Sequence, residues 1–392
     1  ISKSTFYEVK LNSLRTTAIE GSPVTNPAAL DGVSSNLVWE SWTNLPDGFN
    51  YGETDADVST EKTRTISLDA SITSQATSSH MLLAGLQGNW YGIDVYDLSS
   101  VTSRTGGSLT QYSAKPYEVG LYVQDKMEFE GMIANVGLRL DMYNANVMYY
   151  TDTFAPYRYT DSLGLQRVDE RFAKKEKTPV VARLQPRAGF SFPVSTETVF
   201  HVNYGTFLQR PPFIRIISQT VNRKELYSYG GALSVVGTLG NPRLRPEVTS
   251  SYDIGATQAL GAGFTLDISG YYKDVRDLLQ QAIYSSKQGN YVTYINRDYA
   301  DIRGFRAGFA KRSGMLTGTL NYTYGVSTGK NSSSDGNQVP TIYESGPSKD
   351  PVPQDILLDF DRTHNLVANV GFSTPLEWGP VLFGAYPLER IT

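Results

Sequence analysis

Apolar side chains recur at every second residue through most of this chain, and that period restricts its fold more than any other feature. In residues 133–143 one parity is apolar and the other is polar: Val136, Leu138, Leu140 and Met142 against Asn135, Gly137, Arg139 and Asp141. Similar alternation is found in residues 65–73, 82–90, 265–272 and 317–324. Because successive side chains of a β-strand point to opposite faces of its sheet, these segments are expected to be strands with one polar face.

Short and long connections between the predicted strands alternate along the chain. Tight polar turns are predicted near residues 77–79, 130–131, 195–197, 261–263, 312–314 and 375–379. Long connections are predicted over residues 97–115, 144–183, 210–245, 277–301 and 328–361. In an up-and-down sheet, successive connections fall at opposite ends, so one end is expected to hold the turns and the other the loops. This asymmetry is typical of outer-membrane barrels, which have short periplasmic turns and long extracellular loops.

Two all-β architectures fit the period of two, a transmembrane barrel and a soluble sandwich or propeller. The predicted strands are roughly 10–15 residues long, whereas strands of soluble sheets are most often about 5–6 residues long. The polar parity is rich in Thr, Ser, Asn, Asp, Arg and Gly, which suits a hydrated lumen. The sequence therefore favours an all-β, antiparallel up-and-down transmembrane β-barrel, with about 13 strands in these residues.

Composition excludes several classes of function. The 392 residues include no cysteine, so disulfides, thiol nucleophiles and thiolate metal sites are excluded. The three histidines, His80, His201 and His364, are far apart in sequence, so no metal site or cofactor is expected. The formal net charge of -4 is unlike the basic surface of a nucleic-acid-binding protein. No nucleophile elbow, Walker loop or dinucleotide fingerprint is expected to lead from a strand into a helix, and no enzymatic activity is expected.

The chain has no run of about 20 apolar residues, so no transmembrane helix is expected. A closed β-barrel can also cross a bilayer, because it pairs all its backbone groups internally. Residues 1–10 contain no apolar signal core, so a secretory signal is either already removed or was never in this piece.

Residue parity assigns candidate positions to the two faces of the barrel wall. The residues expected to face the lumen are Asp69, Arg139, Asp141, His201, Asp267 and Lys273. Those expected to face lipid are Val136, Leu138, Leu140, Leu266, Ile268 and Leu320, and the expected interfacial aromatic residues are Trp90, Tyr272, Tyr322 and Tyr324. The lumen charges are expected to form cross-strand ion pairs, with a substrate conduit as the alternative role.

One long connection contains a mixture of arginines and aromatic rings that suits an anionic chelate or a sugar ring. The candidate ligand-binding residues in it are Arg210, Arg215, Arg223, Tyr227 and Tyr229. The alternative is a solvated loop whose arginines contact lipopolysaccharide phosphates or no ligand.

Several short motifs resemble those of TonB-dependent outer-membrane receptors. Residues 120–125 (GLYVQD) and 137–141 (GLRLD) are similar to a Y-x-Q-D and G-x-R-x-D hairpin of that family, and residues 241–247 (NPRLRPE) to its N-P-x-L-x-P-E element. Further matches are 186–190, 199–204, 211–213, 251–255, 302–306 and 361–364. Arg306 replaces an acidic residue of the family pattern, and Thr363 stands where an arginine is usual. The resemblance covers roughly residues 115–372 and is closest to the group with a carboxypeptidase-regulatory-like N-terminal domain.

The resemblance implies a 22-stranded barrel that is closed by an N-terminal plug. Residues 1–392 are then expected to be one barrel fragment, with the plug, the TonB box and the terminal strands outside it. The implied function is active uptake of a bulky, scarce nutrient, such as a ferric siderophore, cobalamin, a glycan or a peptide, across the Gram-negative outer membrane. The implied partners are outer-membrane lipid and lipopolysaccharide, the nutrient, and TonB acting through the plug. A surface adhesin or protein-binding receptor is the alternative function, followed by a barrel hydrolase.

Overall fold

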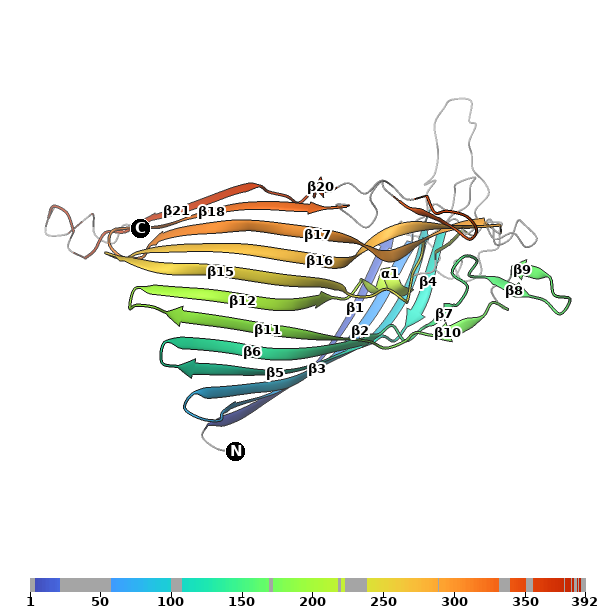
Figure 1. Cartoon of the computed structure of the whole chain (residues 1–392), viewed down its shortest axis with the longest axis horizontal. Coiled ribbons are helices and arrows are strands. Elements are labelled where there is room, and N and C mark those ends of the chain that lie inside the picture. Colours follow the sequence, from blue (N-terminus) through green and yellow to red (C-terminus); the bar gives the residue numbers. More distant parts are fainter. Residues whose placement is uncertain are drawn as a thin grey trace, which may run out of the picture.

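Long antiparallel strands make up most of the computed structural model (Figure 1). It describes residues 4–21, 58–99, 108–168, 172–217, 220–222, 238–287, 289–330, 339–349, 355–376, 378–381, 383, 386 and 388. Twelve long strands form an up-and-down meander in which each strand pairs with the next. They are β1 (Thr5–Gly21), β2 (Val58–Gln75), β3 (His80–Ser99), β5 (Tyr117–Phe129), β6 (Met132–Asn144), β11 (Val181–Pro193), β12 (Thr198–Gln209), β15 (Glu247–Gly261), β16 (Phe264–Ser286), β17 (Gly289–Lys311), β18 (Leu316–Gly329) and β21 (His364–Phe372).

This meander confirms the all-β antiparallel fold and comes close to the expected 13 strands. Strand β4 (Ser108–Ala114) continues the line of β5, because both pair with β3. Among the described residues no pairing joins β1 to β21, so the sheet is open between these two edges. Within the same residues, no helix is both long and apolar enough to cross a membrane.

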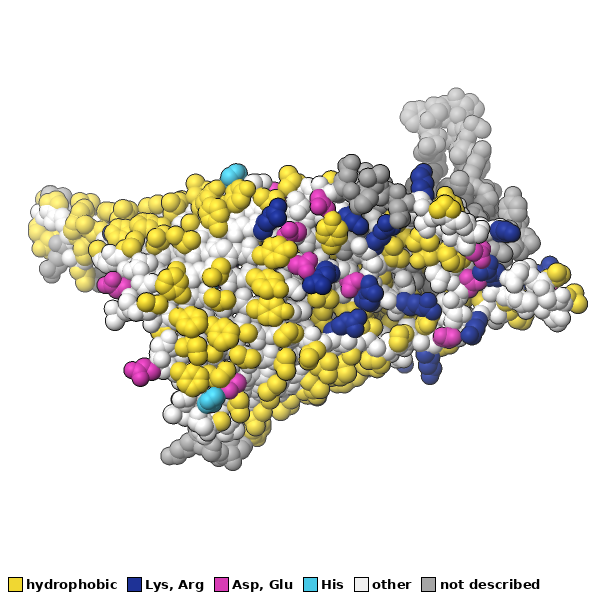
Figure 2. Space-filling model, viewed as in Figure 1, with side chains coloured by type: hydrophobic (Ala, Val, Ile, Leu, Met, Phe, Trp, Pro, Cys, Tyr) yellow, Lys and Arg dark blue, Asp and Glu magenta, His cyan; other side chains and the backbone are white. Residues whose placement is uncertain are grey.

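The two faces of the sheet differ as the alternation predicts. We call the face that carries Leu138 the outer face and the face that carries Arg139 the inner face. The register keeps like faces together, since Leu138 pairs with Val123. The segment that follows β12 folds against the inner face, where the hydroxyl of Tyr143 donates a hydrogen bond to the carbonyl of Leu244 at 2.7 Å. Figure 2 shows that exposed apolar side chains gather on the outer face over the strands.

Each predicted lipid-facing and interfacial residue lies on the outer face. Among the aliphatic positions, Leu140 pairs with Leu121, and Ile268 pairs with Ala256. Tyr272 ends a row of rings across three strands, with centroid distances of 5.1 Å from Tyr204 to Tyr252 and 6.1 Å from Tyr252 to Tyr272. On the next strands, the ring of Phe305 packs against that of Tyr324. Contact of all these outer-face side chains with lipid remains a prediction.

Tight turns and long connections separate to opposite ends of the sheet (Figure 1). Five turns join β2 to β3, β5 to β6, β11 to β12, β15 to β16 and β17 to β18, where tight turns are predicted. Glycine suits turns of this kind, because Gly131 has a φ of 81° and Gly314 a φ of 95°. We call the opposite end the loop end.

One predicted long connection is wrong. Residues 277–301 were expected to form a loop, but β16 and β17 run through them as one extended hairpin that turns near residue 287. The register shifts between Val275 and Leu278, where Asp277 adopts a φ of 60°, and pairing then resumes. This bulge adds residues to one strand without ending the pairing of the two strands. Beyond it, β-branched and aromatic residues such as Tyr291, Val292 and Tyr294 favour strand pairing.

A short helix and the segment around Leu244 form a cover over the inner face at the loop end, whereas two pairs of short strands project beyond the long strands (Figure 1). Helix α1 (Phe213–Ile217) buries Ile216 and Ile217, which pack with Tyr143, Leu244 and Tyr294. The other short strands are β7 (Met148–Tyr150), β8 (Arg158–Thr160), β9 (Gln166–Val168), β10 (Lys175–Lys177), β13 (Thr220–Asn222), β14 (Thr238–Leu239), β19 (Thr341–Tyr343) and β20 (Ile356–Leu357). Strand β7 pairs with β10, β8 with β9, and β13 with β4.

Because the two faces of the sheet differ, we expect an added charge to lower the stability more on the outer face than on the inner face. Leu138 is 47% exposed in the middle of the outer face of β6. We expect Leu138→Arg to lower the free energy of unfolding in phospholipid vesicles by about 2–4 kcal/mol, because its charge enters hydrocarbon. Gln124 lies beside Val123 but on the inner face, and Gln124→Arg is expected to cost far less. Equal losses in denaturant titrations of the two variants would contradict the assignment of the faces.

The loop cover depends on one buried side chain. Ile216 is 1% exposed, whereas Ile214 of the same helix is 52% exposed. We expect Ile216→Ala to destabilise the cover by about 2–5 kcal/mol, because it leaves a cavity in the small core. Amide hydrogen exchange in residues 210–217 and 238–246 should then accelerate, while the exchange rates in the long strands should not change. Equal acceleration in Ile214→Ala would show that the buried contact is not what holds the cover.

Candidate ligand-binding site at the loop end

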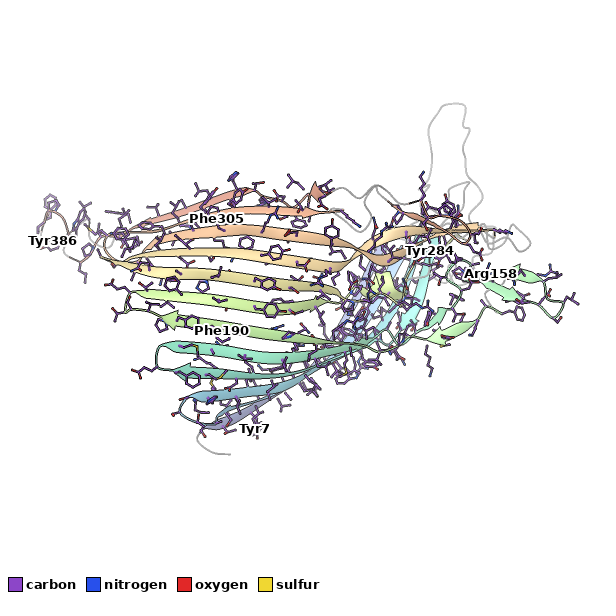
Figure 3. All side chains as sticks on the ribbon, in the orientation of Figure 1. Tyr7, Arg158, Phe190, Tyr284, Phe305 and Tyr386 are labelled. Atoms are coloured by element: carbon purple, nitrogen blue, oxygen red, sulfur yellow. The ribbon has the colours of Figure 1, made fainter. Side chains whose placement is uncertain are left out.

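A cavity of about 510 Å³ lies at the loop end. Its walls come from the β7–β10 pair, residues 152–156, residues 239–243 and the parts of β16 and β17 beyond the bulge. Figure 3 shows Tyr284 at this end of the sheet, with Arg158 farther out among the short strands. The extension of β16 and β17 therefore supplies one wall, and the connections from β6 and β12 supply the others.

Aromatic rings form a rigid part of this cavity. Tyr284 and Tyr291 are stacked across the β16–β17 extension with their centroids 5.6 Å apart. Phe154 packs edge-on against Tyr284 at 5.4 Å, and the Tyr291 hydroxyl donates a hydrogen bond to the carbonyl of Thr153. Burial raises the pKa of both tyrosines, so their phenols stay neutral at physiological pH. The wall therefore offers ring faces and hydroxyl groups without negative charge.

Two cations lie over other tyrosine rings of the cavity. The guanidinium of Arg243 is 4.8 Å from the centroid of Tyr149 and donates a 3.3 Å hydrogen bond to its hydroxyl. The ammonium of Lys175 is 4.7 Å from the centroid of Tyr150. A cation over a ring keeps part of its charge available to a second, anionic partner.

Among the described residues, Asp152 is the carboxylate that lines the cavity, and it already accepts several hydrogen bonds. Asp152 accepts hydrogen bonds from the backbone N–H groups of Phe154 and Ala155, both at 3.0 Å, and from Nε of Arg158 at 2.6 Å. Arg158 also donates to Glu344 at 2.5 Å, which ties this turn to the connection after β18. The described charged residues that line the cavity are two cations, Lys175 and Arg243, and one carboxylate, Asp152, so its chemistry suits an anionic or hydroxyl-rich ligand.

A second cavity of about 440 Å³ lies on the inner face. It brings together three predicted lumen residues, Asp69, Arg139 and Asp141. Nε of Arg139 donates to Asp141 at 2.8 Å, and Nη1 donates to Oε1 of Gln87 at 2.8 Å. Asp141 also accepts a hydrogen bond from Gln185. The hydrogen bonds with Gln87 and Gln185 join β3, β6 and β11, whereas the ion pair of Arg139 with Asp141 lies within β6 and is not the cross-strand pair that was expected.

The other predicted lumen residues also lie on the inner face. His201 lines a third cavity of about 310 Å³, and its Nε2 is 3.2 Å from Oδ1 of Asp253. Asp267 accepts a hydrogen bond from Thr257 at 2.6 Å, and Lys273 pairs in register with Ser251. Sequence spacing did not reveal Asp253 as the partner of His201, because the two residues are on different strands. Within the described residues, no group of three or more His, Asp or Glu side chains is arranged to hold a metal ion.

The described arginines of the predicted ligand-binding loop have different surroundings from those expected. Nε of Arg210 donates to Glu118, and its guanidinium lies 3.6 Å from the ring centroid of Phe213. The guanidinium of Arg215 lies 4.3 Å from the ring centroid of Tyr294. Neither arginine lines the loop-end cavity, and their ligand-binding role remains a prediction. Arg223, Tyr227 and Tyr229 lie outside the described residues.

The sequence analysis did not predict the residues that line the loop-end cavity. Arg243 belongs to the recognised motif at 241–247, but that motif carried no site prediction. Tyr284 and Tyr291 lie in the segment expected to be a loop, where the alternation of aromatic and β-branched residues could have indicated strands.

Residues 325–329 have the spacing Gly-x-Ser-x-Gly, but they lie inside β18 and form no turn into a helix.

The family model described as "TonB dependent receptor-like, beta-barrel" matches residues 14–386. The match covers most of the chain, which therefore belongs to the TonB-dependent receptor β-barrel family. This result confirms the family indicated by the sequence motifs.

Solved receptors share the fold. The ferric yersiniabactin uptake receptor FyuA from Yersinia pestis is similar with a TM-score of 0.56 and 8% identity, over 97% of this chain and 46% of that chain. The copper transporter OprC gives a TM-score of 0.52 and 16% identity, over 86% of this chain and 45% of that chain. FpvA from P. aeruginosa, solved with a heterologous pyoverdine and iron, gives a TM-score of 0.52 and 10% identity, over 96% of this chain and 42% of that chain. The chain thus spans less than half the length of these three receptors.

Proposed function

We propose that this chain forms the wall and the extracellular mouth of an outer-membrane receptor for active uptake of a bulky, scarce nutrient. The loop-end cavity is the place where we expect that nutrient to bind. Energy is proposed to come from TonB through a plug domain. Membership of a receptor family supports a transport role without enzymatic activity. The names of two neighbours, a ferric yersiniabactin uptake receptor and a copper transporter, are consistent with such cargo.

The observation that carries the proposal is the position and chemistry of the loop-end cavity. It lies where the long connections meet the barrel wall, which is the end that would face the outside. Its volume of about 510 Å³ is within the range of about 300–1,000 Å³ that is usual for small-molecule sites. Ring faces from Tyr284 and Tyr149, with the charges of Arg243 and Lys175, favour an anionic ligand with flat or sugar-like parts.

Uptake by the complete receptor tests this role. Cells that lack the gene would be screened with labelled ferric siderophores, cobalamin, glycans and peptides, and we expect loss of uptake of one class. In the complemented strain, the double variant Lys175→Gln and Arg243→Gln should raise the half-saturating concentration about 5–30-fold, because each cation contributes roughly 0.5–1 kcal/mol. The amount of receptor in the membrane should not change.

A matched double variant at the opposite end controls for lost charge. Lys126→Gln and Arg312→Gln remove two cations near the tight turns and are expected to leave half-saturation unchanged. Normal uptake of every nutrient class in the deletion strain, together with lost binding to cells or proteins, would support the adhesin instead. Unchanged half-saturation in the cavity variant would place the ligand elsewhere.

A further inference from the structure

The recognised NPRLRPE motif is attached to strand β17 at two places. The side-chain amide of Asn241 donates a 2.8 Å hydrogen bond to the carbonyl of Tyr294. Two residues farther along β17, the side chain of Asn296 binds the backbone of Arg245. Arg243, one of the two cations of the loop-end cavity, lies between these attachments in the motif. Strand β17 therefore holds the motif on both sides of Arg243.

Asn296 uses all the hydrogen-bonding groups of its amide. Its Oδ1 accepts a hydrogen bond from the backbone N–H of Arg245 at 2.7 Å. Its Nδ2 donates to the carbonyl of Arg245 at 2.9 Å and to the carbonyl of Asp277 at 2.7 Å. A side-chain amide offers one acceptor group and two donors, whereas an ionised carboxylate offers acceptors alone. Asparagine can therefore bind the backbone of Arg245 as a neighbouring strand would, and hold Asp277 as well.

The same side chain secures the bulge of β16. Asp277 has a φ of 60°, which residues other than glycine rarely adopt. Its carbonyl is bound by Asn296, and its carboxylate accepts a hydrogen bond from the guanidinium of Arg245. An unfavourable backbone conformation persists only where several surrounding contacts hold it. Asn296 thus joins the motif to the bulge from which the cavity wall extends.

Asn296 is separate from the cavity that it supports. Tyr291 and Thr293 of β17 line the cavity, and Asn296 has the opposite parity on that strand. Asn296 is half-buried and is not one of the described residues that line the cavity. Arg243, in contrast, lines the cavity and donates a hydrogen bond to the hydroxyl of Tyr149. Any effect of Asn296 on a ligand must therefore pass through the backbone of the motif.

We propose that Asn296 is a positioning residue of the loop-end cavity. By fixing the backbone of Arg245, it holds the guanidinium of Arg243 over the ring of Tyr149, ready for an anionic ligand. A side chain that is already in place loses less conformational freedom when the ligand binds, so the affinity is higher. The inference rests on the proposed function of this cavity.

Amide hydrogen exchange in the purified full-length receptor, without ligand, tests the backbone contact. Asn296→Leu is close in size and removes all three hydrogen bonds. We expect the amide of Arg245 to exchange about 10-fold faster, while helix α1 and strand β6 exchange as in the wild type. The matched control is Asn290→Leu, at an exposed position of the same strand and parity. Unchanged exchange at Arg245 in Asn296→Leu, or equal acceleration in the control, would overturn the proposal.

A double-mutant cycle tests whether Asn296 acts through Arg243. The probe is the labelled ferric siderophore, cobalamin, glycan or peptide whose uptake the deletion strain loses. Arg243→Gln should raise the half-saturating concentration about 2–5-fold, and Asn296→Leu by up to the same factor, with the maximal uptake rate unchanged. Combining the two should be no worse than Arg243→Gln alone, because the second change removes what the first one positions.

Lys175 provides the comparison for that cycle, because it belongs to a different segment, β10. The effects of Asn296→Leu and Lys175→Gln should multiply, since Lys175 keeps its place over Tyr150 when the motif loosens. Multiplying effects in both pairs, or a fall in the maximal rate, would indicate general loosening of the loop end. Either result would overturn a positioning role for Asn296.

A second variant keeps the test decisive if Asn296→Leu does not assemble in the membrane. Asn296→Asp keeps the shape and the acceptor for the N–H of Arg245, but it has no donor for the two carbonyls. It should therefore also raise the half-saturating concentration. If Arg243→Gln raises that concentration and neither Asn296 variant does, the positioning role fails alone. If Arg243→Gln has no effect, the cavity fails as the ligand site, and the positioning role fails with it.

Discussion

The register of the antiparallel pairs is the constraint on which the rest of the structure depends. A strand that slips by one residue moves all its side chains to the opposite face. In β6, that slip would place Leu138 inside and Arg139 outside, and it would break the contacts of Arg139 with Gln87 and of Asp141 with Gln185. The inner-face polar network and the outer apolar face therefore specify the same register. Tight turns at one end hold the strands in that register.

The loop end shows how the same sheet continues into a different environment. A bulge at Asp277 separates the regular wall from the extension of β16 and β17. Beyond it, Tyr284 and Tyr291 line a cavity. Helix α1 fills the space next to it with Ile216 and Ile217. One continuous strand pair thus contributes both to the barrel wall and to the cavity.

Local patterns predicted the strands well because alternation and turn residues are properties of neighbouring positions. The site required contacts between distant segments, which alternation does not contain. Arg210 binds Glu118, 92 residues away, and His201 meets Asp253 on another strand. The loop predicted at 277–301 was wrong, because the chain forms a bulge at Asp277 and strand pairing then resumes.

The central claim is that one face of the sheet contacts lipid and the other contacts water. It is tested most directly by single spin labels placed along β16 from Phe264 to Leu279, in the full-length receptor reconstituted in vesicles. Relaxation by oxygen, which is concentrated in lipid, and by a water-soluble nickel complex would be measured at each position. The account predicts that the two alternate with a period of two and in opposite phase up to Val275. Accessibilities that rise and fall together along the strand would contradict it.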